Sequence, residues 1–265
     1  MSTTTIPDSD NSTSQEDNRL AYAHGTVMTI TWMVFASTGI LFARYGRLLR
    51  IGSKRKILGE FIWFQAHRLT LSLAAFSTLL GFFLVLAQAT GSWVNLDDDG
   101  PYVVAHSILG IIIVGFALIQ IWMALFRCHP TTRFRFIFNW LHRSVGLLAF
   151  VLSIPTIFLI ISTLTNYQSG LYIVMSIWTG WTVFIFGLLE ILTYLNQRNS
   201  TSSSEHTYRT DREYELRPSS SISNNNTDND QEDRFNQMKL ILLGIYVIIA
   251  IALVIPFIVL IWQQN

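Results

Sequence analysis

Charged residues are scarce in this sequence. Only 13% of its 265 residues are Asp, Glu, Lys or Arg, whereas 51% are hydrophobic. A soluble domain carries about 25% charged residues, so this composition excludes an ordinary soluble protein and indicates an integral membrane protein. Cysteine is scarcer still, because Cys128 is the only one. A single cysteine excludes an intramolecular disulfide, and cysteine use therefore does not reveal the redox compartment.

The first 19 residues lack the apolar core of a signal peptide. We therefore expect a polar exoplasmic tail over residues 1–19, followed by an apolar run that inserts itself. A run of about 20 apolar residues can cross a bilayer, and in lipid it must be helical. Six runs qualify, which predicts an all-α, multi-pass transmembrane helical bundle of six spans. They cover residues 22–43, 66–89, 103–126, 141–164, 171–195 and 238–262.

A composition break divides the chain after the fifth span. Residues 20–195 form a predicted five-span transmembrane domain. Residues 196–237 are rich in Ser, Asn, Thr and charge, which predicts a disordered cytoplasmic linker. Residues 238–262 then form an additional transmembrane helix that contains no histidine, and its role is open.

The basic residues lie almost wholly on one side of the predicted spans. Seventeen of the eighteen Lys and Arg residues fall in or beside segments 44–65, 127–140 and 196–237, and Arg19 is the exception. The positive-inside rule makes these three segments cytoplasmic and the N-terminus exoplasmic. Plasma membrane and endomembrane both remain open as the host membrane.

Four successive spans each begin within about four residues of a histidine. These residues are His24, His67, His106 and His142. An ionisable group within a span is costly unless it has a partner. Because consecutive spans run in opposite directions, His24 and His106 share a depth near the exoplasmic face, and His67 and His142 share a depth near the cytoplasmic face.

Each matched pair can supply both axial ligands of a heme iron. The sequence thus predicts a four-helix core with two b-type hemes, held by His24 and His106 and by His67 and His142. Interfacial polar histidines, a proton relay and a non-heme metal site are the alternatives. The last two usually recruit a carboxylate within the span, which each pair lacks.

Two glycines follow the first two histidines at similar spacing. Gly39 lies fifteen residues after His24, and Gly81 lies fourteen residues after His67. At ~100° per residue each glycine is near the face of its own histidine. We predict that the missing side chains admit the flat ring of the heme in the other layer. Ordinary close helix packing is the alternative.

Arginines flank the predicted cytoplasmic heme. Arg68 and Arg143 directly follow two histidines, and Arg44 and Arg127 end the facing spans. Guanidinium groups pair with carboxylates, so these residues could hold heme propionates or receive an anionic reductant. Topology alone also places basic residues there. At the opposite face, three aspartates at 97–99 either attract ferric iron or begin a helix, and we favour the helix start.

Short motifs around the histidines carry a resemblance to a known family. They are Ala23-His24-Gly25 with Met28, Trp32, Gly39 and Ala43-Arg44; Trp63-Phe64-Gln65-Ala66-His67-Arg68; His106 with Leu109-Gly110; Phe126-Arg127 with Pro130; and Phe138-Asn139-Trp140-Leu141-His142 with Gly146. Over about residues 20–195 the chain resembles the cytochrome b561 family, and in particular the cytochrome domain of ferric-chelate reductase 1-like proteins.

This resemblance implies a transmembrane oxidoreductase with two b-type hemes. It would pass single electrons from a cytoplasmic donor, such as ascorbate, to an exoplasmic acceptor, such as ferric iron, a ferric chelate or monodehydroascorbate. Ferric-chelate reductase 1-like chains carry soluble domains before the cytochrome unit, including a DOMON domain, whereas about twenty residues precede it here. This difference motivates a heme-containing membrane sensor or assembly partner as an alternative, and a non-heme six-span transporter is a further, less favoured one. The expected partners are lipid and small molecules and not nucleic acid, and homodimerisation stays open.

Overall fold

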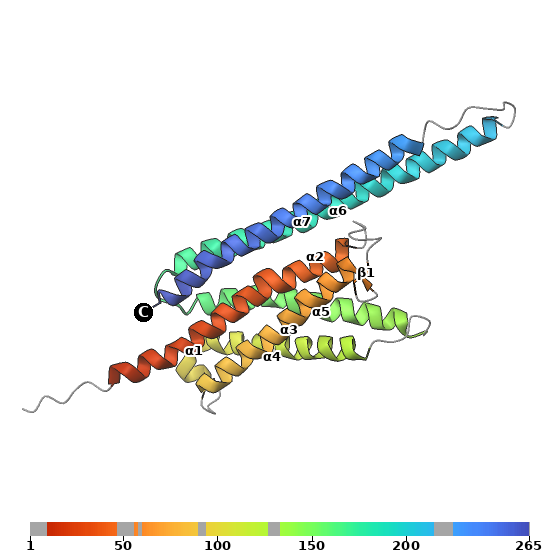
Figure 1. Cartoon of the computed structure of the whole chain (residues 1–265). Coiled ribbons are helices and arrows are strands. Elements are labelled where there is room, and N and C mark those ends of the chain that lie inside the picture. Colours follow the sequence, from red (N-terminus) through yellow and green to blue (C-terminus); the bar gives the residue numbers. More distant parts are fainter. Residues whose placement is uncertain are drawn as a thin grey trace, which may run out of the picture. The chain divides into compact units, whose positions relative to one another are not determined.

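The computed structural model describes residues 10–46, 56–57, 60–89, 94–126, 133–214 and 225–264. Most of these residues are helical (Figure 1). Strands β1 (Lys56–Ile57) and β2 (Glu60–Phe61) form a short antiparallel pair. The helices are α1 (Asp10–Ile30), the π-helix η1 (Thr31–Ala36), α2 (Ser37–Tyr45), α3 (Ile62–Ala89), α4 (Leu96–Leu125), α5 (Arg135–Ile161), α6 (Gln168–Tyr214) and α7 (Asn225–Trp262).

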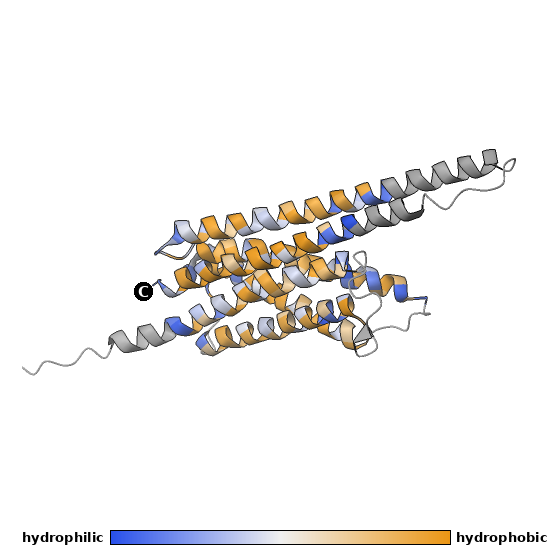
Figure 2. Ribbon diagram, turned by 45° about the horizontal axis from the view of Figure 1, so that its top comes forward, coloured by the Kyte–Doolittle hydropathy of each residue, from blue (hydrophilic) through white to orange (hydrophobic). Residues whose placement is uncertain are grey.

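Six helical segments are long and apolar enough to cross a membrane. Figure 2 shows apolar residues along the middle of the long helices and polar residues towards their ends. The predicted all-α fold with six spans is therefore confirmed, and the protein is an integral multi-pass membrane protein. The segments are Asn18–Tyr45, Ile62–Ala89, Leu96–Leu125, Arg135–Ile161, Gln168–Arg198 and Asn236–Trp262.

Two helices extend into residues 196–237, the segment for which the sequence predicts a disordered linker. Helix α6 continues to Tyr214, and α7 begins at Asn225. No Gly or Pro occurs between the fifth span and Pro218. A helix that already exists adds residues far more easily than a new one nucleates, so α6 can extend well beyond its apolar part. Residues 215–224 lie outside the described part, and the domain boundaries stay a prediction.

The chain divides into two compact units, which are described separately. The first contains Met1–Ser37, Arg68–Trp178 and Ala250–Asn265. In it α4 packs against α5, and η1 contacts α5. Its buried side chains come from every span that it includes. They include Met33, Ala74, Val114, Ala117, Ala149, Phe150, Ile157, Leu171, Trp178 and Phe257.

The π-helix η1 widens one turn of the first span. Such a turn leaves main-chain carbonyls outside the regular α-helical ladder. The carbonyl of Met33 accepts hydrogen bonds from the Ser37 hydroxyl at 2.7 Å and from the Trp178 indole at 3.2 Å. Trp178 is fully buried, so its N–H needs such an acceptor. The wide turn thereby joins the first span to α6 within this unit.

The aspartates at 97–99 begin α4. The Asn95 side chain caps the backbone N–H of Asp97, while Asp98 and Asp99 accept hydrogen bonds from the side chain and backbone of Asn95. Acidic residues suit a helix N-terminus, where unpaired N–H groups carry partial positive charge. Gly100 then takes a positive φ of 79° before the main part of the helix. The helix-start interpretation of this cluster is therefore the one that the structure supports.

The second unit contains Thr38–His67 and Thr179–Ile249. Arg44 pairs with Glu190 through two hydrogen bonds of 2.7 and 3.1 Å. The buried Tyr45 hydroxyl donates to the same carboxylate at 2.9 Å. These bonds connect the end of α2 to α6, and the Thr182 and Tyr246 hydroxyls bond α6 to α7 at 3.3 Å.

Gly46 allows the end of α2 to lie close to the start of α3. Its N–H donates to the Phe42 carbonyl at 3.0 Å. A Cβ added at Gly46 would lie 2.5 Å from this carbonyl oxygen and 2.8 Å from the Cβ of Trp63. Both neighbours are fixed to the backbone, so neither can turn aside. Only glycine fits here without a shift of the backbone.

We expect Gly46→Ala to destabilise the protein by about 1–3 kcal/mol, the usual cost of forcing atoms into a packed site. The measurement is thermal unfolding of purified protein in detergent. Gly187→Ala is the matched control in the same unit, because a Cβ there meets nothing within 4 Å. That control should be neutral or slightly stabilising. Equal melting temperatures for the two variants would show that the close approach at Gly46 does not require glycine.

Candidate functional site

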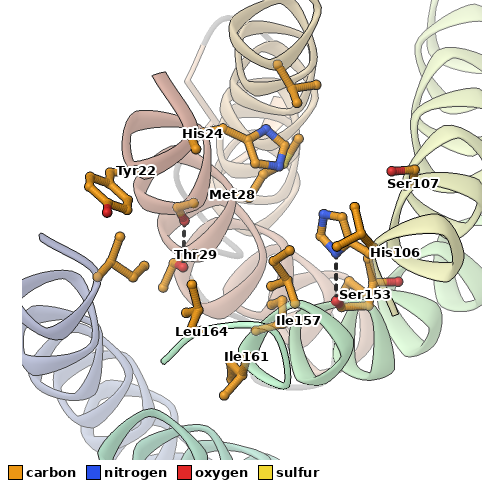
Figure 3. Close-up of a pocket in the computed structure, with 18 of the residues that line it drawn as sticks. Tyr22, His24, Met28, Thr29, His106, Ser107, Ser153, Ile157, Ile161 and Leu164 are labelled. Atoms are coloured by element: carbon orange, nitrogen blue, oxygen red, sulfur yellow. Dashed lines mark hydrogen bonds between the residues drawn. The ribbon is translucent and has the colours of Figure 1, made fainter. Parts of the chain in front are cut away.

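His24 and His106 face one another within the first unit. His24 lies on α1 and His106 on α4, and their ring centroids are 6.2 Å apart with an angle of 79° between the ring planes. Figure 3 shows the two imidazoles pointing toward one another from their separate helices. The structure therefore brings together the two histidines that the sequence places near the exoplasmic face.

The two imidazoles line a cavity of about 600 Å³. This volume is within the range of cofactor and ligand pockets. The wall is largely apolar, with Trp32, Ile113, Val114, Ile157 and Ile161 among its residues. Such a site can hold a large flat apolar molecule while a few polar groups fix its orientation.

Three of the four predicted histidines donate from Nδ1 to a main-chain carbonyl of another helix. The distance is 2.8 Å from His24 to Gly81, 2.9 Å from His106 to Thr156 and 2.9 Å from His67 to Gly39. A carbonyl oxygen only accepts, so each bond fixes the proton on Nδ1. For His24 and His106 this leaves Nε2 as the nitrogen that can ligate a metal.

Two of these three bonds join the first span to α3. The first span provides the donor His24 and the acceptor Gly39, and α3 provides the donor His67 and the acceptor Gly81. His24 and Gly39 are fifteen residues apart with η1 between them, while His67 and Gly81 are fourteen residues apart in a regular helix. A π-helical turn holds about one residue more than an α-helical turn. The two separations therefore correspond to about the same helical advance, which the sequence alone did not indicate.

Gly81 also permits close packing against the first span. A Cβ there would lie 2.9 Å from the Met28 methyl carbon. Met28 is one turn from His24 on the same helix, so the bare face of Gly81 accommodates its side chain. This contact matches the close-packing alternative. The predicted role of Gly39 and Gly81 in admitting a heme ring stays a prediction.

His67 and His142 belong to different compact units, so each is described on its own. The His67 ring lies beside Phe64 at 6.4 Å. The His142 ring stacks on Phe138 with centroids 6.2 Å apart and nearly parallel planes. Gln120, a polar residue within α4, donates to the His142 carbonyl at 2.9 Å and so connects this turn of α5 to α4. Their predicted pairing stays a prediction.

The four arginines differ in their surroundings. Arg44 is held by Glu190, and a heme propionate would have to compete with that carboxylate. Arg68 and Arg143 are exposed, and neither forms an ion pair with a described residue. Arg127 lies outside the described residues. Arg68 and Arg143 are therefore better placed than Arg44 to meet an anion.

Several residues at the cavity were not predicted from the sequence. Thr156 acts through its backbone carbonyl, for which no side chain gives a signal. Phe257 and Ile261 of α7 and Gln264, two residues after its end, line the cavity, although α7 contains no histidine. Gln88 also lines it, and its Oε1 is buried without a hydrogen-bond partner among the described residues. In the sequence, the only sign of a polar group at this cavity was that Gln88 is a glutamine near the end of an apolar span.

Known proteins provide an independent comparison. A Danio rerio relative of ferric-chelate reductase 1 is 31% identical over 190 residues, which are 69% of this chain and 30% of that protein. Human ferric-chelate reductase 1 is 32% identical over 140 residues, 53% of this chain and 22% of that protein. A cytochrome b561 and DOMON domain-containing protein of Arabidopsis thaliana is 30% identical over 135 residues, 51% of this chain and 30% of that protein.

No protein-family model and no solved structure matches the chain. The chain spans less than a third of the length of each of these three relatives. At about 30% identity, these homologues confirm the predicted relationship of the chain to the cytochrome b561 family.

Proposed function

We propose that the protein transfers single electrons across a membrane through two b-type hemes. One would be held by His24 and His106 and the other by His67 and His142. The observation that carries the proposal is the facing pair of imidazoles in an apolar cavity, each with Nδ1 bonded to a carbonyl.

The separation of His24 and His106 supports a shared metal ion. Two imidazoles that ligate one ion from opposite sides have centroids about 6 Å apart, since each metal–nitrogen bond is about 2 Å long. The observed distance is 6.2 Å. No group of three or more His, Cys, Asp or Glu side chains suited to a metal ion occurs in the described part of the chain. Two imidazoles alone suit a heme, which provides the remaining ligands itself.

A bound heme iron would accept and release single electrons. The protein would orient each imidazole of the His24/His106 pair through the bond from its Nδ1–H to a carbonyl, and its apolar wall would exclude water. Nδ1–H bonds to carbonyls make an imidazole a stronger ligand. Electron transfer at the iron needs no acid or base, and the proton that ascorbate loses would go to water.

The direction of transfer follows from the proposed topology. The basic segments would be cytoplasmic, so His67 and His142 would lie on the side of the donor and His24 and His106 on the side of the acceptor. Ascorbate is the proposed donor, and its monoanion would lose one electron to the protein and one proton to the cytoplasmic water to become monodehydroascorbate. The acceptor would gain that electron outside, as ferric iron does when it becomes ferrous. Arg68 and Arg143 would attract the anionic donor.

We expect His106→Ala to reduce the heme content from about two per chain to about one, because one axial ligand is lost while the other pair is intact. The measurement is a pyridine hemochrome assay together with a reduced-minus-oxidised spectrum. His67→Ala should remove the other heme. His206→Ala, outside the apolar spans, serves as the control and should retain both. A His67→Ala variant with both hemes and unchanged spectra would refute the assignment.

Turnover separates the electron-transfer proposal from a heme-containing sensor or assembly partner. We expect proteoliposomes loaded with ascorbate to reduce external ferricyanide, and ferric citrate more slowly, at rates that depend on both hemes. Liposomes with the His106→Ala protein should lose most of this rate. Two hemes without any transfer would favour the sensor, and a colourless protein from heme-sufficient cells would favour the transporter.

A further inference from the structure

The C-terminal end of α7 forms part of the cavity wall beside His24 and His106. Phe257, Ile261 and Gln264 line the cavity. Phe257 and Ile261 are only 2% and 7% exposed, so their side chains are packed inside the first unit, to which this end of α7 belongs. The span that the sequence separates from the histidine-bearing helices therefore reaches the candidate site.

This end of α7 contacts the turn that carries the first histidine. The Trp262 indole N–H donates to the Thr26 hydroxyl at 3.0 Å, and the indole meets the Tyr22 ring edge-on at 5.8 Å. Ile261 Cδ1 lies 3.5 Å from the position that a Cβ on Gly25 would take. Residues on both sides of the histidine are thus held by α7.

A second set of bonds joins Gln264, two residues after the end of α7, to the connection between α5 and α6. The Gln264 side-chain amide donates to the Asn166 carbonyl at 2.6 Å and accepts from the Asn166 backbone N–H at 3.2 Å. The Asn166 side chain donates to the Gln264 carbonyl at 3.2 Å. Leu260 packs next to Gly170, and its Cδ1 lies 3.2 Å from the position that a Cβ added to Gly170 would take. The last turns of α7 are therefore fixed at two places.

We infer that Phe257–Gln264 is a positioning element of the exoplasmic heme site, which orients His24 and closes the cavity to water. The inference rests on the proposed function, because heme is the group that the site would hold. Contacts that orient a ligand affect metal affinity, and the apolar shell around a site affects its redox potential. The site would thus consist of the histidine-bearing helices together with the sixth span.

The test compares two isoleucines of the same helix in the full-length protein. Ile261 packs beside Gly25 and is 7% exposed, whereas Ile255 is 60% exposed. Both Ile→Ala changes remove the same atoms. We expect Ile261→Ala to weaken heme binding at the His24 site about tenfold, the lower end of the effect of groups that orient ligands. Ile255→Ala should match the wild type.

The readout must resolve the two hemes separately. Potentiometric titration and EPR of the oxidised protein should show a changed midpoint and changed g-values for one heme in Ile261→Ala, while the His67/His142 heme stays unchanged. A milder variant, Trp262→Phe, keeps an aromatic ring and removes the donor to Thr26. It should shift the same EPR signal without loss of heme, which also covers the case that Ile261→Ala does not fold.

Three results would overturn the inference. Identical heme signals in Trp262→Phe and the wild type, with Ile261→Ala equal to Ile255→Ala, would show that α7 does not position His24. Equal changes in both hemes would show general destabilisation instead. A wild-type protein without heme would refute the proposed function as well, and this is visible before any variant is made.

Discussion

An imidazole ring inside an apolar helix needs a hydrogen-bond partner, and this constraint governs how the helices of the protein meet. A ring N–H that is buried among apolar side chains has no water to bond to, so leaving it unpaired would be costly. His24, His67 and His106 each meet the constraint with a carbonyl from another helix. The helices must therefore stay within hydrogen-bond distance at these depths. A polar requirement thus specifies the packing of otherwise apolar surfaces.

The arrangement of the first span depends on its irregular turn. With η1, the fifteen residues from His24 to Gly39 cover about the same length of helix as the fourteen from His67 to Gly81. The histidine of each helix can therefore donate to the carbonyl of the glycine in the other helix. The same turn exposes the Met33 carbonyl, which receives the buried Trp178 indole. One extra residue thus affects both the alignment of histidines and the attachment of α6.

The large-scale features of the fold could be predicted from the sequence. An apolar run in lipid can only be helical, so the six spans follow from composition. The spacing also predicts that His24 and His106 meet, whereas the pairing of His67 with His142 stays a prediction. The π-helix could not be predicted, because Thr31–Ala36 contains no residue that demands it. The contacts of α7 depend on tertiary packing, and α6 extends past its predicted end because polar composition does not distinguish a disordered linker from an extended helix. Arg44 lies at the end of a span, where the positive-inside rule predicts a basic residue. Its partner Glu190 lies 146 positions away in the sequence, so this ion pair could not be predicted.

The acceptors for the three histidines belong to the main chain, at Gly39, Gly81 and Thr156. Replacing a side chain leaves its carbonyl in place. An alanine scan would therefore leave these acceptor atoms in place, although a Cβ added at Gly81 would lie 2.9 Å from the Met28 methyl carbon and the Met28 side chain would have to move. Insertions, deletions or a new proline nearby would move the carbonyls and would be the damaging changes. The identity of the side chain at these three positions thus matters for packing but not for the presence of the acceptor atom.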